Sequence, residues 1–144
     1  LAGEPHLDSS VLVRIRRVPL FVLVPGGRLA GEVPVIGGQV DIAPTLLALL
    51  GLPSPPCFVG HALDPDADSI AVLNDGSVVG EGRVFVAEGP AIPRGGACFA
   101  WPDGAPRPLE ECRELARRGR EELTASRFVA IHDLAPEIAG LRLP

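Results

Sequence analysis

Residues 18–60, VPLFVLVPGGRLAGEVPVIGGQVDIAPTLLALLGLPSPPCFVG, decide the fold class of this chain. Residues 18–24 are a continuous apolar run of strand length, rich in β-branched residues, and Pro25-Gly26-Gly27 ends the run. A run that is apolar on both faces is typical of a central strand covered on both sides. The run therefore predicts an α/β sheet in which residues 18–24 form one buried strand.

A capped helix follows this predicted strand. Residues 33–36 are short and extended, and Gly37-Gly38 ends them. Asp41 stands at the predicted N-cap, where its side-chain oxygen is placed to accept amide hydrogens of the first turn. The first turn also tolerates Pro44, whose missing N–H has no partner there in any case. The apolar face and the C-terminal stop of the helix are given by Leu46, Leu47, Leu49, Leu50 and Gly51.

The second half of the chain has the pattern of a small antiparallel sheet and a helix. Residues 70–73 and 77–79 flank Asn74-Asp75-Gly76, which predicts a β-hairpin with Asp75-Gly76 in a type I′ turn. Two more strands are predicted at residues 83–87 and 97–101.

The pattern after the sheet is helical over residues 108–124, although Gly119 is expected to weaken the middle of that helix. Residues 126–131 fit either a continuation of the helix or a strand. His132-Asp133-Leu134 then begins a last short helical turn.

Composition limits the function classes. With 144 residues and 47% apolar content, the chain is long enough to bury one modest core. All 13 basic residues are Arg, the net charge is −5, and no basic block is long enough to follow a phosphate backbone, so we expect no nucleic-acid partner. No run approaches the roughly 18 apolar residues of a membrane span. Because the chain lacks Met and begins at Leu1, we expect it to be a fragment of a longer protein.

The three cysteines do not have the spacing of a metal site, since no pair is two to four residues apart. Cys98 and Cys112 flank a turn-rich loop, and a disulfide between them is plausible outside the cytoplasm. Free thiols in a small apolar core are an equally good interpretation. The third cysteine is Cys57.

Three motifs resemble the C-terminal part of enzymes of the sulfatase and alkaline-phosphatase superfamily. They are VPLFVLVPG at residues 18–26, GQVDIAPTLL at 38–47 and FVGHAL at 58–63, in that order. Within the superfamily the chain is most similar to lipoteichoic acid synthase-like phosphoglycerol transferases, and EELTASRFVAIHDL at residues 121–134 extends this resemblance more weakly.

The resemblance implies an α/β fold that is the C-terminal portion of an alkaline-phosphatase-like sandwich. A central sheet strand with its covering helix would be followed by a small antiparallel sheet and a C-terminal helix. Residues 1–66 would then be the C-terminal part of the catalytic domain, and residues 67–144 a small C-terminal subdomain.

The resemblance also implies a function for the parent protein. Enzymes of this group use a Thr, Ser or formylglycine nucleophile bound to one or two divalent metal ions, here manganese, magnesium, calcium or zinc. The parent would act on a lipid-linked or small-molecule phosphate or sulfate ester, most closely as a phosphoglycerol transferase on lipid headgroups. It would be extracytoplasmic and associated with the cell membrane through its N-terminal part. The alternatives are a plain sulfatase and a non-catalytic module that retains the fold.

The catalytic centre of such an enzyme is absent from this sequence. The chain contains neither an Asp-His dipeptide nor a Cys/Ser-x-Pro-x-Arg nucleophile motif. We therefore expect the nucleophile upstream of residue 1, no metal bound by this segment, and no activity from this segment alone.

The polar residues that remain have both a functional and a structural interpretation. His6 lies where the family's loop leaves the metal site and is the candidate substrate-binding residue, although an exposed loop histidine is the simpler interpretation. Thr45 has no base beside it and is expected to be structural. His61 is expected at the surface, and His132 in a cap.

Two further groups of side chains have a possible role at a lipid surface. Arg14, Arg16 and Arg17 would face anionic lipid or substrate, or else a solvated strand edge. Phe99 and Trp101 would contact a lipid headgroup, or else pack in the core.

Overall fold

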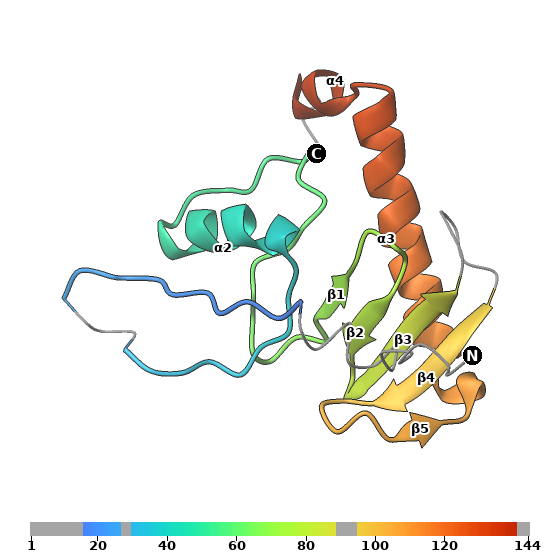
Figure 1. The fold of residues 1–144 in the computed structure, drawn as a ribbon. Coiled ribbons are helices and arrows are strands. Elements are labelled where there is room, and N and C mark those ends of the chain that lie inside the picture. Colours follow the sequence, from blue (N-terminus) through green and yellow to red (C-terminus); the bar gives the residue numbers. More distant parts are fainter. Residues whose placement is uncertain (1–15, 27–29, 89–94, 141–144) are drawn as a thin grey trace, which may run out of the picture.

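The computed structural model describes residues 16–26, 30–88 and 95–140. Its centre is an antiparallel sheet whose strands follow one another in chain order (Figure 1). The strands are β1 (Ile70–Val72), β2 (Val78–Gly80), β3 (Arg83–Glu88), β4 (Gly95–Ala100) and β5 (Pro106–Arg107). The predicted small antiparallel sheet is confirmed.

Helices precede and follow this sheet along the chain. The 3₁₀ helix η1 (Gln39–Asp41) and helix α2 (Ile42–Leu49) precede it. The 3₁₀ helix η2 (Leu109–Cys112), the long helix α3 (Arg113–Ile131) and the short α4 (Ala135–Gly140) follow it. The predicted C-terminal helix is therefore confirmed, and residues 126–131 continue it rather than forming a strand.

The sheet is apolar on both faces, and each face has its own cover. On one face Val78 and Phe85 pack against Leu115 of α3, which is fully buried. On the other face Val79 and Val84 pack with residues that include Ile36, Phe99 and Trp101. Residues 33–36, predicted to be extended, form no strand, but they supply Ile36 as part of this second cover.

Gly119 is a contact residue of α3 rather than a weak point in it. A Cβ built on Gly119 would lie 2.1 Å from Cγ2 of Val78, so the helix approaches β2 closely only because the side chain is absent. The helix continues without a break to Ile131. The contact with the sheet offsets the roughly 1 kcal/mol that glycine costs in a helix.

The β1–β2 hairpin forms where it was predicted, but its turn is of a different type. Gly76 has φ +89°, whereas Asp75 does not have the positive φ that a type I′ turn requires. Leu73 pairs with Ser77 across the loop, and Gly76 N–H donates to the Leu73 carbonyl at 2.9 Å. The type I′ prediction was wrong, because the Asp75 side chain instead accepts the Ser77 N–H at 2.9 Å. Positive φ at two successive residues occurs at Glu81 and Gly82, between β2 and β3.

Residues 18–24 do not form the predicted strand. They are extended, and Figure 1 shows them (blue) running away from the sheet. Phe21 is 84% exposed and Leu23 is 93% exposed. A strand that is apolar on both faces needs neighbouring strands and a cover on each side. The described part of the chain supplies no strand to pair with it.

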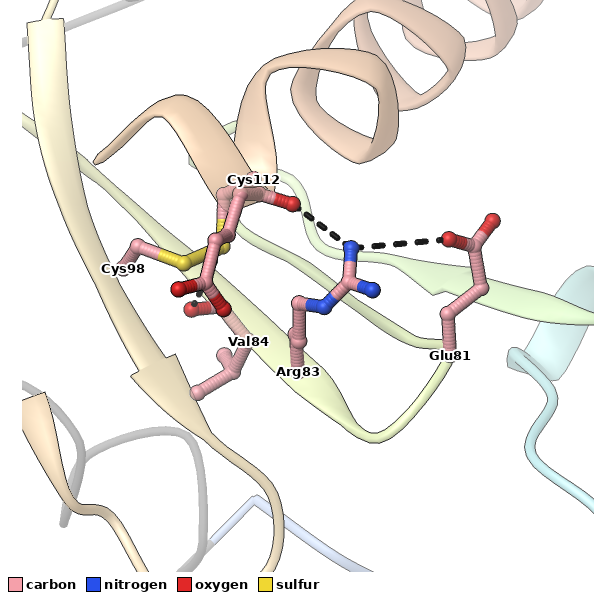
Figure 2. The surroundings of a disulfide bond; sticks show 6 residues. Glu81, Arg83, Val84, Cys98 and Cys112 are labelled. Carbon is pink, nitrogen blue, oxygen red and sulfur yellow. Dashed lines mark hydrogen bonds and ion pairs between the residues drawn. A yellow bond between two sulfur atoms is a disulfide. The ribbon is translucent and has the colours of Figure 1, made fainter. Parts of the chain in front are cut away.

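A disulfide joins Cys98 of β4 to Cys112 at the end of η2 (Figure 2). Both half-cystines are buried, and they belong to the same apolar cluster as Leu115. The sulfur of Cys112 lies 3.6 Å from the Val84 carbonyl oxygen. The question that the sequence left open is thus answered in favour of the disulfide, and Cys57 is the free thiol.

Replacing both half-cystines by alanine is expected to lower the free energy of unfolding by about 3 kcal/mol, because the bond closes a short loop of the unfolded chain. Urea unfolding followed by circular dichroism measures this loss. Cys57→Ala is the matched control and should leave the midpoint unchanged. Equal effects of the two replacements would contradict the assignment of the disulfide.

Candidate functional site

Asp41 is the buried polar centre of the N-terminal half. It is 7% exposed, and its carboxylate accepts the Gly38 N–H at 2.7 Å and the His61 N–H at 2.9 Å. Asp41 occupies the N-cap position of α2, but its side chain makes no bond to the first turn of that helix. The predicted bond to the first turn of α2 is wrong because one carboxylate oxygen caps the preceding 3₁₀ helix η1 at Gly38. The other oxygen accepts the His61 N–H of the return loop.

Thr45 completes the connection one helical turn later. Its hydroxyl donates to the Asp41 carbonyl at 2.6 Å and accepts the Leu63 N–H at 2.9 Å. The Thr45 hydroxyl thus uses its one donor and one of its acceptor lone pairs within the scaffold. Thr45 therefore has the structural role that was predicted for it.

Two glycines make this contact sterically possible. A Cβ on Gly60 would lie 2.2 Å from the Val40 carbonyl oxygen, and a Cβ on Gly37 would lie 2.2 Å from the Leu63 side chain. We call Asp41, Thr45 and these two glycines the α2 clamp. The clamp explains why the GQVDIAPTLL and FVGHAL motifs occur together. Asp41 and Thr45 of the first motif accept the backbone N–H groups of His61 and Leu63 in the second.

Helix α2 ends as its sequence predicts. Gly51 has φ +68° and follows the last turn. Its N–H bonds to the Ala48 carbonyl, and the Leu52 N–H bonds to the Leu47 carbonyl at 2.9 Å. This pair of bonds is the Schellman arrangement, which requires a left-handed residue at the position of Gly51.

A shallow cleft of about 330 Å³ lies between α2 and the loop that returns to the clamp. Its described lining is mostly apolar and includes Pro44, Leu52 and Phe58, and His61 is its one ionisable side chain. Acid–base or nucleophilic catalysis requires a second group within hydrogen-bond reach of the first. In the described lining, no hydrogen bond joins the His61 ring to Ser54, so these two side chains do not form a nucleophile–base pair in this structure.

The two described histidines do not converge on a site. His61 is exposed at the rim of the cleft, as predicted. His132 is the C-cap of α3, with its ring centroid 4.3 Å from that of Phe128, so it ends α3 rather than starting the last turn, which begins at Ala135. His6 lies outside the described residues. Within the described ranges, no group of three or more His, Cys, Asp or Glu side chains is placed to hold a metal ion.

Arg16 and Arg17 attach the N-terminal segment to the small sheet. Arg16 forms an ion pair with Asp75 in the β1–β2 hairpin loop, and Arg17 lies over the Trp101 ring at 5.8 Å from its centroid. Partial burial acts to raise the pKa of Asp75, but the Ser77 N–H and the Arg16 guanidinium outweigh it and hold that pKa below its ordinary value. Both arginines are exposed while they make these contacts with the small sheet, and Arg14 lies outside the described residues.

Trp101 and Phe99 pack against the sheet with Val79 and Val84, which is the simpler of their two predicted roles. Sequence reasoning missed the contact of Arg17 with Trp101. The two residues are 84 positions apart, and no local pattern links them.

Glu122 is a second feature that the sequence did not indicate. Burial raises the pKa of this half-buried carboxyl on α3. His61 and Arg118 act in the opposite direction, while Asp41 adds to the increase. The Asp41 carboxylate of the α2 clamp therefore contributes to the raised pKa of Glu122 on α3, although the two residues are far apart in the sequence.

Comparison with known proteins adds one relative. Over 139 aligned residues the chain is 28% identical to the lipoteichoic acid synthase-like protein YvgJ of Bacillus subtilis (strain 168). The alignment covers 92% of this chain and 21% of that protein. No family model matches the chain, and no solved structure matches it significantly. The resemblance to lipoteichoic acid synthase-like proteins, predicted from the motifs, is confirmed.

No helix in the described ranges combines the length and the apolar character needed to cross a membrane.

Thr45→Val is expected to lower the free energy of unfolding by about 1–3 kcal/mol, because it leaves the partly buried Leu63 N–H without an acceptor. Hydrogen exchange at the Leu63 amide should accelerate. Thr45→Ser is the matched control and should retain slow exchange, since it keeps the hydroxyl. Slow exchange in the valine variant would contradict the role of the clamp.

Glu122→Gln is expected to stabilise the protein at pH 7. A carboxyl with a raised pKa in the folded state favours folding while it is protonated, and stability falls as pH rises from its unfolded pKa through the folded one. Thermal unfolding measured from about pH 4 to pH 7 should show a flatter pH profile for the variant. Glu137→Gln on α4 is the control, and an identical change in both variants would exclude this cause.

Proposed function

We propose that this chain is the C-terminal part of an extracytoplasmic, metal-dependent hydrolase or transferase of the sulfatase-like group. We further propose that the complete enzyme is a phosphoglycerol transferase acting on phosphate esters of lipid headgroups. One observation carries the proposal: the similarity to a lipoteichoic acid synthase-like protein extends over 92% of this chain. The chain spans 21% of the length of that relative.

The described residues contribute scaffold to this enzyme rather than chemistry. Asp41 and Thr45, the two residues in the shared motifs that most resemble catalytic groups, are bonded within the clamp. Since the described acidic, histidine and cysteine side chains do not form a ligand set, no catalytic step is assigned to them. The proposal places the nucleophile and the ligands of a manganese, magnesium, calcium or zinc ion upstream of residue 1, with His6 as the one substrate-binding candidate in this segment.

The disulfide supports the proposed location. Disulfides between buried cysteines form and persist in oxidising compartments and are rare in the cytoplasm of mesophiles. Cys98 and Cys112 are 3% and 0% exposed, so the bond is shielded from soluble reductants. The presence of this disulfide favours an extracytoplasmic domain. The proposal also includes membrane association through an N-terminal part, because the family resemblance implies it.

Activity measurements test the proposal. The 144-residue chain and the polypeptide encoded by its complete reading frame are each incubated with manganese and bis(p-nitrophenyl) phosphate, p-nitrophenyl sulfate or phosphatidylglycerol vesicles. We expect the short chain to be inactive and the complete polypeptide to release glycerophosphate products from the vesicles. EDTA should abolish that activity, since the metal polarises the ester oxygens and activates the nucleophile.

The other outcomes are equally informative. Activity of the short chain would overturn the claim that it lacks the catalytic centre. Activity of the complete polypeptide on the sulfate alone would identify a plain sulfatase. A folded but inactive complete polypeptide would identify a non-catalytic module.

A further inference from the structure

Arg16 and Arg17 contact the small sheet at two separate points. Arg16 forms an ion pair with Asp75, in the loop that precedes β2. Arg17 lies over the ring of Trp101, whose N–H donates to the Gly82 carbonyl at 2.8 Å in the turn that follows β2. Two successive residues therefore reach contacts beyond opposite ends of one strand. We call Arg16 and Arg17 the arginine tether.

The Asp75 carboxylate is held in position by its own hairpin. It accepts the Ser77 N–H at 2.9 Å, and the Ser77 hydroxyl donates to it as well. Ser77 is 2% exposed, and its hydroxyl in turn accepts the Ala87 N–H of β3 at 3.1 Å. Ordering a long side chain to form an ion pair costs conformational entropy, and an acceptor that is already ordered lowers this cost. Arg16 therefore binds a carboxylate whose orientation β3 has fixed.

The second contact lies on the apolar face of the sheet that α3 does not cover. Trp101 packs there beside Val79 and Val84 and remains partly exposed. An exposed ion pair and an exposed cation–π contact each favour the bound arrangement by no more than about fivefold. Because the two arginines share one backbone, forming either contact raises the effective concentration of the other. The two weak contacts are therefore expected to form and break together.

We propose that the arginine tether is a cooperative strap, closed at neutral pH and low salt, that opens when either contact is lost and then uncovers the Trp101 ring. Salt opens the strap because it screens the exposed ion pair of Arg16 with Asp75. Residues 18–26, which follow the tether, carry no charge and offer no second ion pair to hold the strap closed.

Acid acts on the same contact through Asp75. Partial burial acts to raise the pKa of Asp75, but the Ser77 N–H and the Arg16 guanidinium outweigh it and hold that pKa below its ordinary value. A carboxyl with a lowered pKa stabilises the closed strap above its ordinary pKa, and this contribution is lost as pH falls through the lowered value. Arg127 of α3 also reaches this loop, where it donates to the Asn74 carbonyl at 2.8 Å, and it stays charged throughout.

Acrylamide quenching of Trp101 fluorescence tests the cooperativity, since Trp101 is the single Trp of the chain and there is no Tyr. Arg16→Gln does not alter the residue over the ring. It should nevertheless raise the open population about two- to fivefold, as expected for the loss of one exposed ion pair, and the quenching constant with it. Arg17→Gln should have a similar effect, and the double variant should add little to either.

Arg16→Lys is the conservative control and should quench nearly as the unsubstituted chain does, because it retains the charge. Far-UV circular dichroism checks that each variant keeps the small sheet. Unchanged quenching in Arg16→Gln would show that the two contacts are independent and would overturn the proposal.

The response to acid and salt gives a second readout. Quenching should increase from about pH 7 to about pH 3 and from about 0.02 M to about 1 M NaCl. Asp75→Asn should begin at the higher level and respond to neither. Asp103→Asn removes a carboxyl two positions from Trp101 and is the matched control, which should keep both responses.

Responses that persist in Asp75→Asn, as they would if acid simply unfolded the sheet, would overturn the proposal. Responses that disappear in Asp103→Asn would also overturn it, since they would belong to the Trp101 turn and not to the tether. Neither measurement requires the complete enzyme or its activity, so failure of the proposed function would leave both results unchanged.

Discussion

The packing of α3 on one face of the small sheet is the constraint on which the C-terminal half depends. Leu115 and Cys112 are fully buried there, and Gly119 lets the helix approach Val78. The disulfide from Cys112 to Cys98 fixes the start of the helix to β4. The sheet is a simple antiparallel meander. The contact between α3 and the sheet therefore stabilises both the strands and the helix that covers them.

The N-terminal half is organised differently, around a buried carboxylate instead of a packed apolar layer. Asp41 receives two backbone N–H groups, and Thr45 links its carbonyl to the return loop. Such a network defines a local conformation well, since every buried polar group in it has a partner. It does not bury the apolar residues around it, so much of the apolar surface of the N-terminal half remains exposed.

The turns, the α2 clamp and the small sheet are internally bonded. Large apolar side chains remain exposed at residues 18–24 and on α2. The two tethering arginines join the halves through Asp75 and Trp101. The same residues thus contact the small sheet and begin the exposed apolar segment at residues 18–24. The scaffold role proposed above agrees with this exposed apolar surface.

Local patterns in the sequence determined the elements that depend on nearby residues. These are the helix at α2 with its glycine stop, the hairpin around Gly76, the strands β3 and β4, and the helical pattern that became α3. The motifs at residues 18–63 also carried the family resemblance. They did so without showing what their polar residues bind, because the partners of Asp41 and Thr45 lie about 20 residues away.

Only the tertiary structure decided the matters that depend on distant contacts. It directed Asp41 to Gly38 and His61 rather than to the first turn of α2, and it paired Cys98 with Cys112. It also made Gly119 a contact with Val78 instead of a helix defect. It also showed that an apolar run is not a strand by itself. Residues 18–24 have the composition of a central strand, but a strand exists only where neighbouring backbones accept and donate its hydrogen bonds.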